Sequence, residues 1–184
     1  MNLAKLPSDL PAPLDDGAAD HLTGLFLPEI QLNATNGEIV TLNNLQGKYV
    51  IYIYPMTGQP GTALPEDWDS IPGARGCTPQ SCSFRDNADG LAILNTHIFG
   101  LSSQTTEYQL EARNRLHLPF ELLSDTSFLL KESVGLPTFF ANKKELYKRL
   151  TMIVDNGKII KTFYPVFPPD KNIDDVTHWL KNHD

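Results

Sequence analysis

The chain has 184 residues, of which 41% are hydrophobic, and this is enough for one domain that buries roughly 70% of its extended surface. Its 15 basic and 22 acidic residues give a net charge of −7, which argues against nucleic acid or an anionic membrane surface as the main partner. No apolar run approaches the roughly 18 residues of a membrane span, and the N-terminal stretch lacks the apolar core of a signal peptide. We therefore expect a cytoplasmic protein, in a compartment where thiols stay reduced.

The first third of the chain predicts an arm, a hairpin and a central strand. Residues 1–22 are rich in Pro, Asp and Ala, and we expect them to run over the surface as an N-terminal arm. The turn sequence ATNG separates residues 29–33 from residues 38–42, which is typical of a β-hairpin. Residues 48–55, KYVIYIYP, form a continuous apolar, aromatic and β-branched run. This pattern predicts a buried central strand that ends at Pro55.

A long loop and a helix follow this strand. The stretch from Pro55 to Gly76 is rich in proline and glycine and has no periodicity. A loop of that length is uncommon in a compact domain and is usually functional or disordered. Residues 78–94 then predict a helix, because Thr78 can cap it and Pro79 suits the first helical position.

The second half of the chain alternates strands with helices. We expect a strand over residues 97–103, helices over 105–117 and 127–135, and a C-terminal helix over 173–182. Residues 148–166 contain two apolar runs around DNGK, which is a strong hairpin signal. Strands that alternate with helices, together with a hairpin, predict an α/β fold with a mixed sheet.

Both cysteines of the chain, Cys77 and Cys82, lie in the stretch GARGCTPQSCSFRD. Cys77 follows a strand and a loop and stands beside a predicted helix N-terminus, where free amide donors and the helix dipole favour a thiolate. Arg75 and Arg85 add positive charge nearby in the sequence. The alternative for Cys77 is an inert buried residue, which is the commoner fate of a lone cysteine.

The spacing of the two cysteines limits their chemistry. On one continuous helix, residues five apart differ by ~7.5 Å along the axis and ~140° around it, so their Cα atoms lie beyond the ~7 Å at which a disulfide can close. A bond between Cys77 and Cys82 therefore requires the first turns of the helix to unwind, which fits a redox cycle better than a static disulfide. Two thiolates are too few for a tetrahedral zinc site unless a histidine joins them. The nearest, His97, is 15 residues past Cys82, so metal binding is the less favoured alternative.

Four motifs together resemble one protein family. They are IYIYP, GCTPQSCSFRD, LHLPFELLSD and KRLTMIVDNGKI, and they occur in the family's order between about Leu27 and the end of the chain. The sequence resembles the peroxiredoxins, and is most similar to the Q-type (bacterioferritin-comigratory) branch of this thioredoxin-fold family. The resemblance implies a thioredoxin-like fold over residues 23–184, with a central mixed β-sheet flanked by helices and an N-terminal β-hairpin.

The resemblance also implies roles for three residues. Cys77 corresponds to the peroxidatic cysteine, Cys82 to the resolving cysteine, and Arg149 to the arginine that holds the thiolate and polarises the peroxide. Chemistry supports the role of Arg149, because a guanidinium in a predicted apolar strand is costly unless a group such as a thiolate pairs with it. The alternative for Arg149 is a strand-edge charge that reaches solvent. For Arg85 we favour a structural or half-exposed position.

The sequence departs from the family pattern just before Cys77. The family has Pro-xxx-Thr-xx-Cys, with the threonine hydroxyl bonded to the peroxide, but here Ala74 and Ser70 occupy the Thr and Pro positions. Pro55 still ends the strand, yet it lies 22 residues before Cys77, which indicates an insertion of about 15 residues within about 56–73. The hydroxyls that could replace the threonine belong to Thr57, Thr62, Ser70 and Thr78, and the sequence does not choose among them.

The insertion invites a hypothesis of its own. Trp68 would be costly to leave bare in a loop, so we expect it to pack on the domain or on a partner. We hypothesise that the segment folds over the Cys77 pocket, narrows access for large hydroperoxides, and supplies the hydroxyl that Ala74 lacks. The alternative is a surface excursion with no effect on catalysis.

These observations predict a thiol peroxidase that requires no metal, flavin or nucleotide. The Cys77 thiolate would reduce hydrogen peroxide or an organic hydroperoxide, become a sulfenic acid, and form an intramolecular disulfide with Cys82. A dithiol such as thioredoxin would restore the thiols. We expect a monomer or weak homodimer that binds neither nucleic acid nor membrane. The alternatives are a thiol–disulfide oxidoreductase, which would more naturally use Cys-x-x-Cys, and a non-enzymatic redox sensor on the same fold.

Overall fold

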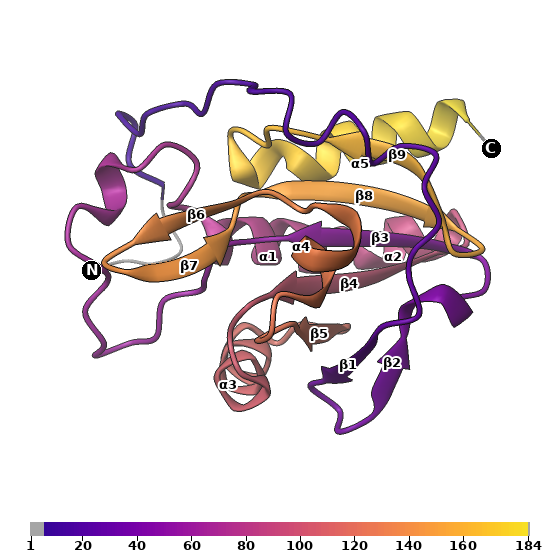
Figure 1. Cartoon of the computed structure of the whole chain (residues 1–184), viewed down its shortest axis with the longest axis horizontal. Coiled ribbons are helices and arrows are strands. Elements are labelled where there is room, and N and C mark those ends of the chain that lie inside the picture. Colours follow the sequence, from indigo (N-terminus) through magenta and orange to yellow (C-terminus); the bar gives the residue numbers. More distant parts are fainter. Residues whose placement is uncertain (1–5, 184) are drawn as a thin grey trace.

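The computed structural model describes residues 6–183, and within them a seven-stranded sheet forms the centre of the molecule (Figure 1). The order of the strands across this sheet is β2-β1-β5-β4-β3-β8-β9. Their bounds are Gln31–Ala34 (β1), Ile39–Thr41 (β2), Lys48–Ile53 (β3), Thr96–Ser102 (β4), Glu121–Ser124 (β5), Leu150–Asp155 (β8) and Lys158–Phe163 (β9). Because β3 pairs in parallel with β4 and antiparallel with β8, the sheet is mixed, as predicted.

Helices cover both faces of the sheet. In Figure 1, α1 and α2 lie behind the sheet and α4 lies in front of it. The α-helices are α1 (Cys77–Asp86), α2 (Ala88–Ile93), α3 (Thr106–Leu116), α4 (Leu129–Val134) and α5 (Asn172–Asn182). Within residues 6–183, the connections contain the short 3-10 helices η1 (Leu42–Asn44), η2 (Trp68–Ser70) and η3 (Pro169–Lys171). The α/β fold with flanking helices and an N-terminal hairpin, β1–β2, is therefore confirmed.

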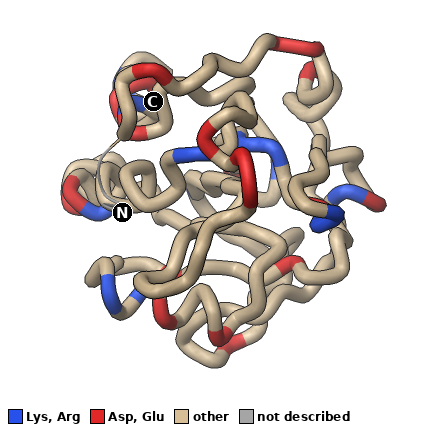
Figure 2. Tube along the Cα trace, turned by 90° about the vertical axis from the view of Figure 1, so that its left-hand side faces the viewer, with Lys and Arg blue, Asp and Glu red and all other residues tan. Residues whose placement is uncertain are grey.

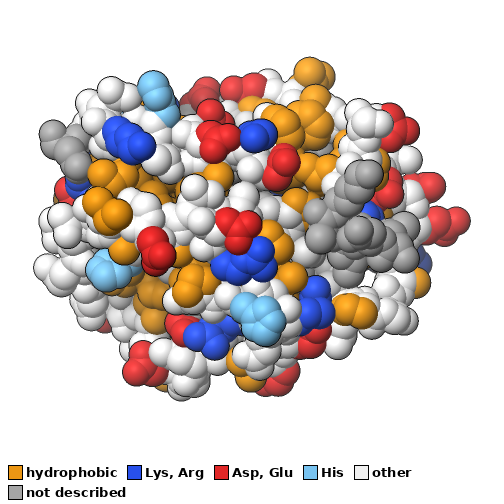
Figure 3. All heavy atoms as spheres, turned by 180° about the vertical axis from the view of Figure 1, so that it is seen from behind, with side chains coloured by type: hydrophobic (Ala, Val, Ile, Leu, Met, Phe, Trp, Pro, Cys, Tyr) orange, Lys and Arg blue, Asp and Glu red, His pale blue; other side chains and the backbone are white. Residues whose placement is uncertain are grey.

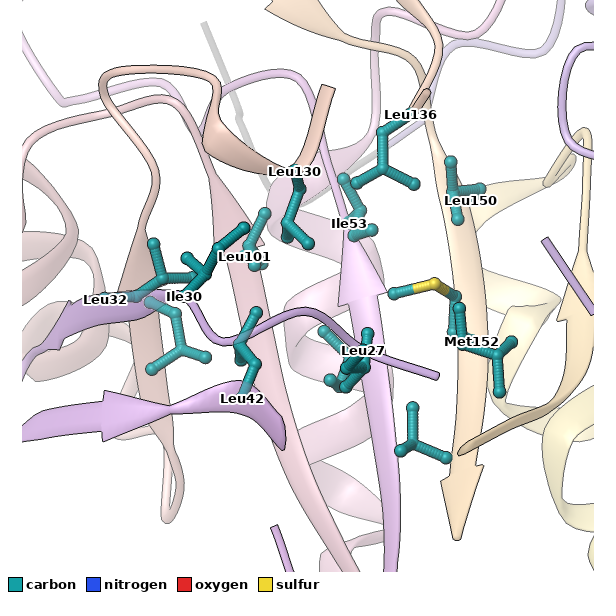
Figure 4. Close-up of a cluster of buried hydrophobic side chains, with 14 of the residues drawn as sticks. Leu27, Ile30, Leu32, Leu42, Ile53, Leu101, Leu130, Leu136, Leu150 and Met152 are labelled. Carbon is teal, nitrogen blue, oxygen red and sulfur yellow. The ribbon is translucent and has the colours of Figure 1, made fainter. Parts of the chain in front are cut away.

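The alternation of side chains along β3 divides the core in two. Val50 and Tyr52 point to a cluster under α1, α2 and α5, whereas Ile51 and Ile53 point to the opposite face. That opposite cluster is built by leucines and isoleucines from the N-terminal segment, the sheet and α4 (Figure 4). Burial on both faces explains why residues 50–53 of β3 are all hydrophobic or aromatic.

The helix predicted over residues 78–94 is two helices, which is a correction. The break falls at Asn87, whose side-chain amide donates to the carbonyl of Ser83 and so competes with the backbone pattern. Thr78 is not the cap: Gly76 is the N-cap of α1, Cys77 begins the helix, and Pro79 lies within it.

The hairpin of β6 (Thr138–Ala141) and β7 (Lys144–Tyr147) was not predicted. Its two strands form a separate sheet, joined by Asn142 and Lys143 at φ 47° and 63°. The turn sequence is Asn-Lys, and lysine rarely adopts this left-handed conformation. The Asn-Gly signature that indicated the β8–β9 hairpin is therefore missing here. Tertiary packing, not local preference, holds this turn.

The segments at the ends of the sheet are irregular. Residues 6–22 form turns and extended chain, and Ala19 and Leu22 within them are buried in the core. Residues 1–5 of the predicted arm and Asp184 of the predicted domain lie outside the described residues. The predicted insertion is loop apart from η2.

Charges of both signs are spread over the surface. Basic and acidic positions are interspersed along the trace in Figure 2, and the face in Figure 3 shows acidic and basic side chains near one another, with hydrophobic ones between them. Some form ion pairs, such as Arg113 with Glu121 at 2.6 Å and Arg115 with Glu111 at 2.7 Å. Among residues 6–183, no helix has the length and apolar character needed to cross a membrane.

Candidate active site

The loop before α1 delivers Cys77 to the start of the helix. Gly76 adopts φ 112°, and a Cβ atom there would lie 2.3 Å from Cγ of Pro169 and 2.9 Å from Cδ2 of Leu6. Only glycine fits this position, because both the backbone conformation and the space exclude a side chain. Cys77 is the first residue of α1 and is 3% exposed. Amides of a first helical turn have no acceptor inside the helix, so they favour negative charge on the sulfur.

Arg149 directly precedes β8, the strand next to β3, and its side chain contacts Cys77. Leu150, its neighbour, pairs with Ile53 at the end of β3, so Arg149 lies at the edge where β3 leads into the loop before Cys77. The Nη2 atom of Arg149 lies 3.2 Å from Sγ of Cys77. Arg149 is 4% exposed, and so the alternative of a solvent-reaching charge does not describe it.

The guanidinium of Arg149 is held by the loop around it. Nη2 also donates to the carbonyl of Ala74 at 3.0 Å and of Arg75 at 3.3 Å, and Nε donates to the carbonyl of Gly73 at 3.3 Å. No carboxylate of the described residues forms an ion pair with Arg149. A buried cation needs a compensating group, and the nearby group that can carry a full negative charge is the thiolate of Cys77.

Gln80 supports this contact, and sequence reasoning missed it. Its Oε1 accepts from Nη1 of Arg149, and its Nε2 donates to Oδ1 of Asn172 at 3.0 Å. Oδ1 of Asn172 also accepts from the hydroxyl of Thr151 at 2.6 Å. Gln80 follows Cys77 by three residues on one helix. This spacing places the two side chains on the same face of α1 and could have indicated Gln80 from the sequence. The partners Asn172 and Thr151 carry no such signal.

Cys82 lies on the same helix as Cys77, and both are free thiols. Residues five apart on an ideal α-helix have Cα atoms about 8.6 Å apart, which is too far for a disulfide. Burial raises the pKa of the Cys82 thiol, despite the nearby charge of Arg85. Arg85 pairs with Asp86 and donates to the carbonyl of Leu116, in agreement with the half-exposed structural position predicted for it.

The predicted insertion packs beside Cys77. Trp68 is 3% exposed and contacts the β6–β7 hairpin and Ala74, so the prediction that it packs on the domain is confirmed. The guanidinium of Arg75 pairs with Asp69 at 3.0 Å and ties the segment to the loop before α1. A cavity of about 10 Å³ adjoins Cys77, and Met56, Gly58, Leu64, Trp68, Arg75, Gly76 and Thr78 line the rest of it. This volume suffices for about one water molecule.

Metal ligation was the less favoured alternative for the cysteines. Across residues 6–183, no group of three or more His, Cys, Asp or Glu side chains is arranged to hold a metal ion. His97, the histidine nearest in sequence, lies on β4 with its ring 5.0 Å from that of Tyr49.

Comparison with known proteins identifies the family. The sequence profile of the family described as Redoxin matches residues 23–177, which is most of the chain. The chain is also 30% identical over 148 residues to Peroxiredoxin Bcp of Bacillus subtilis (strain 168), a match that covers 78% of this chain and 85% of that protein. The chain belongs to the redoxin family, as a peroxiredoxin. The resemblance stated from the motifs is therefore confirmed.

Two further matches extend this result for the peroxiredoxin. Peroxiredoxin Bcp of Escherichia coli (strain K12) is 28% identical over 164 residues, which cover 87% of this chain and 96% of the relative. The crystal structure of Peroxidoxin BcpB from Mycobacterium tuberculosis aligns with a TM-score of 0.70 at 22% identity, over 88% of this chain and 97% of the other. That structural likeness shows the thioredoxin-like fold. As a peroxiredoxin, the chain is a thiol-dependent peroxidase.

Proposed function

We propose that Cys77 is the peroxidatic cysteine of this enzyme, that Cys82 resolves it, and that Arg149 activates it. The observation that supports this proposal most strongly is the 3.2 Å contact between Nη2 of Arg149 and Sγ of Cys77. The arginine stabilises the thiolate before the reaction and the charge on the peroxide oxygens during it.

The first step oxidises the sulfur of Cys77. The thiolate attacks one oxygen of the hydroperoxide, an S–O bond forms, and the O–O bond breaks. The leaving oxygen takes a proton and departs as water or an alcohol. Cys77 is then a sulfenic acid, two electrons more oxidised than the thiol.

The second step requires α1 to unwind. The Cys82 sulfur attacks the sulfenic sulfur, the S–O bond breaks, and water leaves as the disulfide forms. Cys82 and Cys77 cannot meet while residues 77–86 remain one helix, so the bonds of Gln80 to Arg149 and Asn172 break in this step. A dithiol then reduces the disulfide by exchange and is itself oxidised to a disulfide.

The proposal also covers the reductant, the cellular location, the oligomeric state, the substrates and the domain bounds. The reductant is thioredoxin or a similar dithiol, and the enzyme works in the cytoplasm as a monomer or weak homodimer. The substrates are hydrogen peroxide and organic hydroperoxides, with no metal or organic cofactor. Residues 23–184 form the catalytic domain, residues 1–22 an N-terminal arm, and residues 56–73 an insertion beside the site.

A peroxidase assay coupled to thioredoxin and its reductase tests the assignment of the cysteines. The wild type should consume hydrogen peroxide catalytically, Cys77→Ser should consume none, and Cys82→Ser should complete one turnover. The Cys82→Ser product should be a sulfenic acid that dimedone traps on Cys77. A first turnover that survives in Cys77→Ser but not in Cys82→Ser would invert the two roles, and a wild type without turnover would point to a redox sensor.

A further inference from the structure

The peroxide needs a hydrogen-bond partner on its own oxygens, and the side chain of Ala74 cannot provide one. A bound hydroperoxide presents two oxygens, and the oxygen that leaves gathers negative charge as the O–O bond breaks. A hydroxyl close to the thiolate can donate to that oxygen and stabilise the charge. Ala74 is fully buried and has only a methyl group, so a hydroxyl that assists Arg149 in this role has to come from another position.

Three of the four hydroxyls considered from the sequence are unsuited to this role. The hydroxyl of Thr57 bonds to Oε1 of Gln104 at 3.2 Å, and Gln104 also accepts from the Thr57 amide at 2.9 Å. Thr62 and Ser70 are exposed and line a different cavity, formed within the insertion by residues 59–65 and 67–70. The contacts of these residues therefore do not support the hypothesis that the insertion supplies the hydroxyl.

Thr78 has the properties that the other three lack. It follows Cys77 directly on α1 and lines the cavity that adjoins the thiol. It is 4% exposed, yet its hydroxyl forms no hydrogen bond with any of residues 6–183. The hydroxyl oxygen is not fully buried, so it is open to a hydrogen-bond partner that enters from the cavity. A substrate oxygen that occupies the cavity is such a partner.

We propose that the Thr78 hydroxyl binds the peroxide and donates a hydrogen bond to its leaving oxygen. Thr78, on α1, thus takes the hydrogen-bonding role that the family assigns to a threonine at position 74 in the loop. The thiolate of Cys77 attacks the near oxygen, the O–O bond breaks, and the departing oxygen keeps the hydrogen bond from Thr78 while it takes up a proton. The inference rests on the proposed role of Cys77 and adds a residue that touches the substrate.

The test compares Thr78→Val, which removes the hydroxyl and nearly keeps the shape, with Thr78→Ser, which keeps the hydroxyl. Both are made with Cys82→Ser, so that the rate constant for the first oxidation of Cys77 is measured alone. We expect Thr78→Val to lower the second-order rate constant for hydrogen peroxide by about 10- to 100-fold, somewhat below the ~10²–10³ scale for loss of an oxyanion donor. Thr78→Ser should stay within about threefold of the parent. Ser70→Ala, which removes an exposed hydroxyl of the insertion, is the matched control and should have no effect.

A second readout separates substrate binding from an effect on the thiol. Iodoacetamide alkylates the Cys77 thiolate without a peroxide oxygen to bind, so its rate and pH profile should be the same in Thr78→Val and in the parent. Equal slowing of both reactions, an unchanged peroxide rate in Thr78→Val, or a Thr78→Ser rate as low as that of Thr78→Val would each overturn the role of Thr78. None of these outcomes affects the assignment of Cys77, which the Cys77→Ser variant tests separately.

Discussion

The guanidinium of Arg149 lies 3.2 Å from the sulfur of Cys77, although 72 residues separate them in the chain. The antiparallel pairing of β8 with β3 produces this contact, because it brings residue 149 to the edge where the loop toward α1 begins. The remaining donors of the arginine are used by backbone carbonyls of residues 73–75 and by Gln80. Arg149 therefore fixes the shape of the loop as well as the charge beside the sulfur.

Arg149→Met should slow peroxide reduction far more than it destabilises the fold. Methionine roughly keeps the length of the side chain but removes the cation that favours the thiolate and the leaving oxygen. We expect the rate constant with hydrogen peroxide to fall by about 10²-fold or more, the scale for loss of one oxyanion donor. The control is Arg113→Met, which removes a half-buried cation paired with Glu121. A folded Arg149→Met enzyme with the wild-type rate would mean that Arg149 is structural.

Oxidation should unwind the first turns of α1 within one chain. In the thiol form, Gln80 links this helix to Arg149 and Asn172, and the hydroxyl of Tyr52 donates to Ser81 at 3.1 Å. The disulfide breaks these contacts, so the amides of residues 77–86 should exchange hydrogen much faster in the oxidised protein, measured by mass spectrometry. The amides of α3 serve as the internal control and should not change. An oxidised protein that runs as a covalent dimer on a non-reducing gel contradicts this prediction.

The side chains of the insertion should limit the size of the substrate. Because the cavity beside Cys77 is only about 10 Å³, cumene hydroperoxide can enter only if Met56, Leu64 or Trp68 shifts. Replacing residues 57–70 with a short Gly-Ser turn should raise the rate for cumene hydroperoxide relative to hydrogen peroxide. Leu64→Ala tests the same point without removing the segment, and Ile93→Ala, at an exposed position on α2, is its control. An intact fold with an unchanged ratio of the two rates would leave the insertion outside the active site.

The carboxylate of Asp16 should stabilise the packing of the N-terminal segment on the domain, and this stabilisation should depend on pH. Hydrogen bonds from Lys148 and Tyr164 lower the pKa of Asp16 to about 2. A depressed carboxyl pKa stabilises the fold fully above the unfolded value near ~3.9, and the effect is lost as the pH falls through the folded value. Asp16→Asn should therefore lower the free energy of unfolding by at most about 1 kcal/mol at pH 7, and by progressively less between pH 4 and pH 2.

Urea unfolding of the wild type and Asp16→Asn at several pH values measures this difference. The neighbouring variant Asp15→Asn is the control, because among residues 6–183 the Asp15 carboxylate accepts a hydrogen bond only from the amide of Gly17. A difference between the wild type and Asp16→Asn that stays constant down to pH 2 would show that the ion pair is not its cause.

The sequence by itself determined the features that depend on neighbouring residues. The apolar run of β3, the DNGK turn between β8 and β9, and the amphipathic C-terminal helix are encoded by local patterns of polarity and turn residues. The spacing of Cys77 and Cys82 on one helix likewise follows from counting residues, and so does the need for that helix to unwind. The role of Arg149 came from resemblance together with the cost of an unpaired guanidinium in an apolar strand.

Only the tertiary structure decided how distant side chains meet. The contacts of Gln80 with Arg149 and Asn172 join three segments of the chain, and no local pattern in the sequence marks them. The β6–β7 hairpin was not predicted because its turn has Lys143 where a glycine would mark the sequence, and packing against Trp68 and its neighbours stabilises the hairpin. The choice of Thr78 among four hydroxyls also depends on the tertiary structure, because each hydroxyl is equally available in the sequence and only packing shows which ones already have partners.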